Sequence, residues 1–180
     1  MRQLGAALLF FLLPLTLMAV EDVAGVVNGT VKKVDSTTKT IVVRTADGVE
    51  HTFHFVGRTA VHGVHKTGEA SKDALHGVEE GTEVAVHYTT KGTEKTAEEV
   101  DNIGKDGLKA TEGTVTRMGS GGKTIVVKTA DGSEETYHFA SRAASTAGKS
   151  IAKGTEKSAK VTVYYTEEAG HKVAHFFKKT

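Results

Sequence analysis

Histidine is the residue of this 180-residue chain that most clearly offers chemistry, since imidazole binds divalent metals and changes charge near neutral pH. The chain has nine histidines, and two pairs are spaced as H-x-x-H: His51 with His54, and His62 with His65. On a strand, residues three apart point to opposite faces, so His51 and His54 should not bind one ion together. A loop that folds back on its strand could instead gather four histidines around Cu, Ni or Zn. These are His54, His62, His65 and His76.

A repeated segment provides a second set of candidate residues. Residues 29–58 align without gaps to residues 113–142, and 18 of the 30 positions are identical. The folding of a hairpin explains most of this repeat, but not an outward-facing histidine and an arginine four residues later. These recur in both copies, as His54 with Arg58 and His138 with Arg142. We expect either a polar ligand-binding face used twice, or histidines that only pair with a threonine hydroxyl.

No pattern typical of an enzyme active site is found in the sequence. The chain has no cysteine and no G-x-S-x-G motif for a nucleophile. Residues 171–175 read HKVAH, but Lys172 replaces the glutamate of the zinc-protease motif H-E-x-x-H and the segment resembles a strand. Adjacent acidic pairs such as Glu98-Glu99 are expected to be solvated edges, because neighbouring side chains on a strand diverge. The sequence therefore predicts that the protein is not an enzyme.

The amino-terminal residues predict export. Residues 4–18 form an apolar run that follows Arg2 and precedes Ala19, which is the order of a secretory signal peptide spanning residues 1–19. The run is shorter than the roughly 20 residues that a membrane span needs, so we expect no stable span after its removal. An uncleaved anchor is the alternative. We therefore expect a periplasmic or secreted protein, and without cysteine it forms no disulfides.

The charge balance argues against a nucleic-acid partner. Without Arg2, Lys and Arg number 22, equal to the 22 Asp and Glu. Such a balance gives no long-range attraction to phosphate or to an anionic membrane surface. The expected partner is instead an unknown small ligand or an envelope component, and the oligomeric state stays open.

The pattern of apolar residues predicts an all-β fold with one short helix per copy. Segments rich in β-branched and aromatic residues alternate with turn residues, and the order β-β-β-α-β-β suits a small OB-like Greek-key barrel. SH3-like barrels are the alternative. We expect two such barrels in tandem, over residues 25–104 and 111–180. The strands of the first copy are expected at residues 26–34, 40–45, 49–56, 83–89 and 96–103, and the helices at residues 68–76 and 142–150.

The register of the repeated hairpin follows from the positions of its apolar residues. A three-residue loop at 46–48 places Ile41 and Val43 on the face of Phe53 and Phe55, and directs the charged residues outward. In such a loop the last residue is left-handed, a conformation that favours Gly48. The same loop is expected at residues 130–132 of the second copy.

The pattern G-T-V-x-x-V-D…K-T-I-V-V-x-T-A-D-G, followed by L-x-G-V-E-E-G-T-E-V-x-V, resembles the small OB-like β-barrel domains of unknown function of exported bacterial proteins. Matching stretches lie at residues 29–48 and 75–86, and again at residues 113–132 and 154–163. The resemblance implies an exported barrel without catalytic residues. The chain is also similar, more distantly, to periplasmic copper-binding OB proteins. Those use a histidine with methionines and a tryptophan, whereas this chain has no Trp and only Met118 beyond the signal.

Together these features predict an exported, non-catalytic tandem β-barrel that acts as a binding or envelope-associated module and needs no cofactor. A histidine-based protein that binds divalent Cu, Ni or Zn is the alternative.

Overall fold

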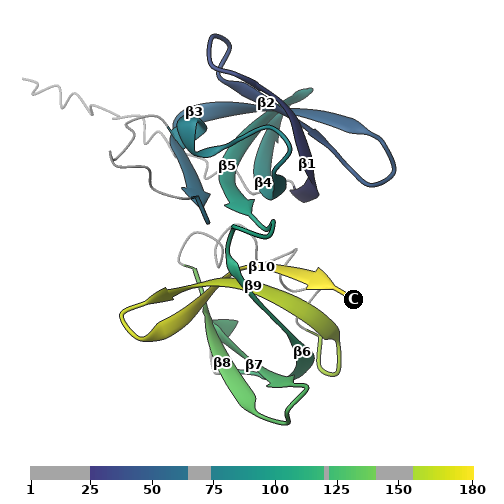
Figure 1. Cartoon of the computed structure of the whole chain (residues 1–180), viewed down its shortest axis with the longest axis vertical. Coiled ribbons are helices and arrows are strands. Elements are labelled where there is room, and N and C mark those ends of the chain that lie inside the picture. The colour runs from purple at the N-terminus through teal and green to yellow at the C-terminus, as the bar shows by residue number, and fades with distance from the viewer. Residues whose placement is uncertain (1–24, 65–73, 120–121, 141–155) are drawn as a thin grey trace, which may run out of the picture.

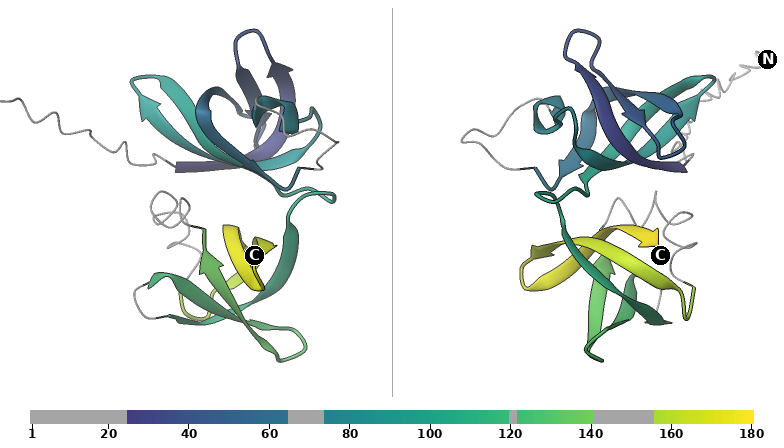
Figure 2. Two further views of the ribbon diagram at one scale, coloured as in Figure 1. Left: turned by 90° about the vertical axis from the view of Figure 1, so that its left-hand side faces the viewer. Right: turned by 45° about the vertical axis from the view of Figure 1, so that its right-hand side comes forward.

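The computed structural model describes residues 25–64, 74–119, 122–140 and 156–180, which form two β-barrels, one above the other in Figure 1. The first barrel closes in the strand order β1-β2-β3-β5-β4, and the second in the order β10-β8-β7-β6-β9. Figure 2 shows the same two units from other sides. The first comprises β1 (Gly25–Asp35), β2 (Thr40–Arg44), β3 (Glu50–His62), β4 (Glu83–Lys91) and β5 (Glu94–Asn102). The second comprises β6 (Lys109–Met118), β7 (Thr124–Thr129), β8 (Glu134–Phe139), β9 (Lys160–Glu168) and β10 (His171–Lys179).

The predicted fold class is confirmed. In each barrel all neighbouring strands are antiparallel except one parallel pair, β3 with β5 and β8 with β10, as is consistent with small OB-like barrels. Of the helix expected at residues 68–76, the described residues show a short 3-10 helix, η1 (Ala74–Gly77). The earlier residues of that segment, the helix expected at 142–150 and the predicted signal at 1–19 lie outside the described residues. Within the described ranges, no helix is long and apolar enough to span a membrane.

The predicted hairpin register is confirmed. Ile41 pairs with Phe53 and both are fully buried, as is Val43, while Phe55 is buried nearby. Beyond the last pair of the ladder, the amide of Thr45 donates to the carbonyl of Val49, so residues 46–48 form the three-residue loop. Gly48 has φ +86°, and the equivalent Gly132 has φ +87°, so the turn requires a left-handed residue in both copies.

The connection between the barrels packs closely against the end of β3. The amide of Leu108 donates to the carbonyl of Asn102, and a Cβ on Gly107 would lie 2.1 Å from that carbonyl oxygen. Gly63 has φ +70°, and a Cβ there would lie 2.7 Å from the Leu108 amide. Since Gly63 directly follows His62, this close approach holds the last residue of β3 at the junction of the two barrels.

Candidate metal centre

Acidic and imidazole side chains meet where the two barrels face each other. His62 ends β3, Glu99 and Asp101 lie on β5, and His175 comes from β10 of the second barrel. One ligand atom from each of these four residues lies within 4.8 Å of the others. Among the described residues, this is the group of three or more histidine and acidic side chains that could hold a metal ion. We call it the inner cluster.

The alternation of β5 explains how the first barrel supplies its three residues. Val100 points into the barrel core and is fully buried, so Glu99 and Asp101 on either side of it point outward. β5 runs parallel to β3, and His62 pairs with Asp101. The outward carboxylates nevertheless have only 2% and 0% of their surface exposed. A strand pattern that normally directs acids into solvent thus places them in a buried junction.

A β-bulge brings His175 to the cluster. The register of β10 against β9 shifts between Ala174 and Phe176, which leaves His175 as the extra residue. Bulges redirect side chains in this way. The first copy has the matching shift, and its extra residue is Glu98. The two extra residues have equivalent neighbours, because Thr166 contacts the His175 ring as its counterpart Thr89 contacts Glu98.

Hydrogen bonds orient the His175 ring. The Thr166 hydroxyl donates to Glu168 Oε1 at 2.9 Å, and a carboxylate oxygen can only accept. Because a hydroxyl has one hydrogen, Thr166 must accept from His175 Nε2–H, which lies 2.9 Å away. The other nitrogen, Nδ1, then faces Glu99 Oε1 at 3.1 Å. A partner on the outer ring nitrogen is the usual way in which proteins orient a metal-binding histidine.

A third histidine, His87, lies behind the cluster and is 1% exposed. Its Nε2 is 3.2 Å from Asp101 Oδ2, close enough for an ion pair, but the angles do not make a hydrogen bond. Both ring nitrogens of His87 and Asp101 Oδ2 therefore lack a hydrogen-bond partner. Buried polar atoms without partners are costly, so these three atoms need a proton, an ion or a water molecule to complete the arrangement.

The two buried carboxylates control the protonation of the cluster. Burial alone would lower the pKa of His62, but its hydrogen bonds to Asp101 and Glu99 raise that pKa to about 10. Burial alone would raise the pKa of Glu99, but hydrogen bonds from His175 and His62 outweigh it and hold that pKa well below its usual range. In the absence of metal, protons on imidazole thus balance the negative charge of the carboxylates.

Four of the six distances between the donor atoms are close to those in a tetrahedral zinc site. Ligands at zinc bond lengths in a tetrahedron lie about 3.3–3.5 Å from one another. His62 Nδ1 is 3.2 Å from Glu99 Oε1 and 3.1 Å from Asp101 Oδ1. His175 Nδ1 is 3.1 Å and 3.8 Å from the same two oxygens. These four distances suit either a shared proton or a metal, and all donor atoms of the cluster lie within 4.8 Å of one another.

The residues predicted to bind a ligand are only partly brought together. His54 is exposed and lies opposite Thr40, as expected, and His138 lies opposite Thr124. Arg58 forms a two-point ion pair with Glu98, with Nη2 to Oε1 at 2.7 Å and Nε to Oε2 at 3.0 Å. Arg142 lies outside the described residues.

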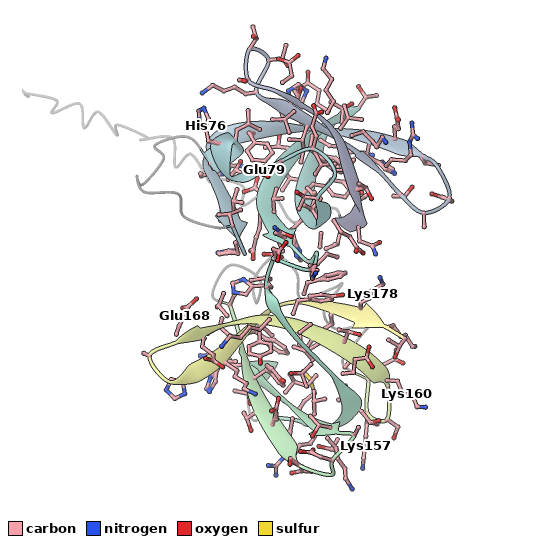
Figure 3. All side chains as sticks on the ribbon, in the orientation of Figure 1. His76, Glu79, Lys157, Lys160, Glu168 and Lys178 are labelled. Atoms are coloured by element: carbon pink, nitrogen blue, oxygen red, sulfur yellow. The ribbon has the colours of Figure 1, made fainter. Side chains whose placement is uncertain are left out.

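Of the four histidines considered for a metal, His62 alone belongs to the inner cluster. His54 lies on the outer face of β3, and His76 is in η1, well above the junction of the barrels in Figure 3. His65 lies outside the described residues. Among the described members of that set, His62 therefore lies beside other possible metal ligands, and these are Glu99, Asp101 and His175.

Sequence reasoning missed Glu99, Asp101 and His175. The expectation that Glu98-Glu99 forms a solvated edge is wrong for Glu99, which the second barrel buries. A signal was available in the comparison of the two copies, because Phe176 and Lys178 occupy the positions equivalent to Glu99 and Asp101. The fold that both copies share does not need these acids, so they are candidates for a separate role.

Comparison with known proteins leaves the family open. No protein-family model matches the chain, and no curated protein does. Among solved structures, a silver-bound protein described as "Crystal structure of Ag(I)CusF" matches with 16% identity and a TM-score of 0.31. The match covers 43% of this chain and 96% of that one. This likeness is too slight to bear on function, which has to be argued from the inner cluster.

Proposed function

We propose that this chain is an exported, non-catalytic protein that binds a divalent metal ion at the inner cluster, between its two barrels. The observation that carries the proposal is the inner cluster, in which two imidazoles and two carboxylates face one another and all but His62 are almost fully buried. Two carboxylates would neutralise a divalent ion, and its charge would take over the role that protons on imidazole have in the metal-free cluster.

The donor set favours Zn²⁺, with Ni²⁺ and Cu²⁺ as competitors. Imidazole and carboxylate together suit these borderline ions, whereas soft Cu(I) prefers thiolate and thioether ligands. The chain has no cysteine, and Met118, the one methionine beyond the predicted signal, lies on β6 with its side chain exposed. Four protein ligands would fill a tetrahedral site and leave no position for a reactive water, which supports binding rather than catalysis.

Calorimetric titration of the chain from Val20 onward with Zn²⁺ tests this proposal. One equivalent should bind with micromolar or tighter affinity, and His62→Ala or His175→Ala should weaken binding at least about 100-fold, because each removes a ligand. His54→Ala is the matched control, since this exposed strand histidine is outside the cluster and should leave affinity unchanged. Absence of binding for Zn²⁺, Ni²⁺ and Cu²⁺, or affinity insensitive to both ligand substitutions, would refute the proposal.

A further inference from the structure

The inner cluster is reached through a cleft that contains more histidines than the cluster uses. The cleft has a volume of about 590 Å³ and is lined by residues of both barrels. His62, Glu99 and His175 lie in its wall, and so do His138, His171 and Glu168. In Figure 3, Glu168 lies on the side of the second barrel that faces the first. Two imidazoles and one carboxylate therefore line the cleft beyond the inner cluster.

His138 and His171 form a pair within this cleft. β8 and β10 run parallel, and His138 pairs with Val173, two residues after His171. Both histidines are exposed, and their ring centres are 5.0 Å apart with the planes inclined at 61°. Two imidazoles bound to one tetrahedral zinc have ring centres about 5 Å apart, given zinc–nitrogen bonds of about 2.0–2.1 Å. The separation of the two ring centres is thus compatible with a shared ion.

The repeat provides an internal comparison for this pair. His54 is the counterpart of His138, but the first barrel has Glu94 at the position equivalent to His171. The first copy therefore keeps the strand histidine without its partner. Since the hairpin folds alike in both copies, the fold does not require the second imidazole. A role in ligand binding explains why only the cleft side of the second barrel has two.

We propose that His138 and His171 form a second, outer site for a divalent ion in the cleft, with Glu168 as a nearby negative charge. For the class of ion, this inference rests on the function proposed above. Two protein ligands with water in the remaining positions bind more weakly than the four of the inner cluster. The outer site should therefore fill only after the inner one, with an affinity at least about tenfold weaker.

Titration with Zn²⁺, followed by NMR of the imidazole nitrogens in the chain from Val20 onward, distinguishes the sites. The first equivalent should shift the signals of His62 and His175, and the second those of His138 and His171. His54 should not respond. His171→Ala should abolish the second event and leave the affinity of the first within about twofold, whereas His54→Ala should change neither.

A double variant separates failure of this inference from failure of the proposed function. With His62→Ala and His175→Ala together, the tight event should disappear while His138 and His171 still respond to Zn²⁺. If the second equivalent leaves these two signals unchanged, or if His171→Ala retains the second event, the outer site is refuted whatever the inner cluster does. If the outer pair responds but His62 and His175 never do, the inner assignment falls and the outer site stands.

Discussion

Binding of Zn²⁺ at pH 7 should release a proton from His62. Hydrogen bonds to Asp101 and Glu99 raise the pKa of His62 to about 10, so this ring is protonated at neutral pH in the absence of metal. A metal ligand must have a free nitrogen lone pair, so the ion has to displace that proton. About three pH units separate neutrality from this pKa. The apparent affinity should therefore be about a thousandfold weaker at pH 7 than at pH 10, and rise about tenfold per pH unit between them.

Calorimetry in two buffers of different protonation enthalpy measures the number of protons released. The release should be about one proton smaller in His62→Gln, which keeps a polar side chain but cannot carry the proton, than in the unmodified chain. Ring NMR of the metal-free protein provides a second measurement, in which His62 should stay protonated beyond pH 8. Equal proton release in both proteins, or a His62 ring that loses its proton near pH 6.5, would refute the argument from the buried carboxylates.

Three further results are expected. Thr166→Val should weaken Zn²⁺ binding about 10-fold to 100-fold in calorimetry, because His175 loses the partner of its outer nitrogen, whereas the matched Thr89→Val in the first copy should not. Gly48→Val should lower the free energy of unfolding in denaturant by about 1 kcal/mol or more, since φ is +86° there; an unchanged midpoint would contradict a left-handed requirement. The stability of the metal-free protein should fall at both high and low pH. The raised pKa of His62 gives stabilisation that is complete below its ordinary value of 6.5 and is lost as pH rises toward about 10, while the lowered pKa of Glu99 gives stabilisation that is present above 4.5 and is lost in acid. Thermal melts from pH 3 to 10 check both limits, and a flat profile contradicts them.

The barrel architecture could be predicted because its determinants are local. Alternating apolar residues and a glycine after Ala46-Asp47 specify the hairpin and its buried face within a short segment. The repeated sequence specifies the same hairpin in the second copy. The inner cluster could not be predicted in this way. Glu99 and His175 are 76 residues apart and meet only when the second barrel covers the outer face of β5. A strand pattern identifies which side chains point outward, but not which outward faces another unit buries.

The bulge at β10 adds a further difficulty, because strict alternation does not predict which way an extra residue points. His175 follows Ala174 and precedes Phe176, both buried, and nothing in that order indicates a polar contact with the other barrel. Comparison of the two copies indicates site residues only at positions where the copies differ, which are Glu99 and Asp101. The two buried carboxylates of the site thus lie at positions where the second copy has a different residue.

One barrel supplies three ligands of the inner cluster and the other supplies the fourth. This division has a consequence for unfolding. Each barrel has its own buried core, and a small cluster that includes Ala85, Ile103 and Phe176 lies at their junction. With so little apolar contact, the barrels are expected to melt as two independent units. An ion held by His175 together with the first-barrel ligands would couple them, because either barrel could unfold only by giving up the ion. Metal would then change the number of cooperative transitions from two to one, as well as raising the melting temperature.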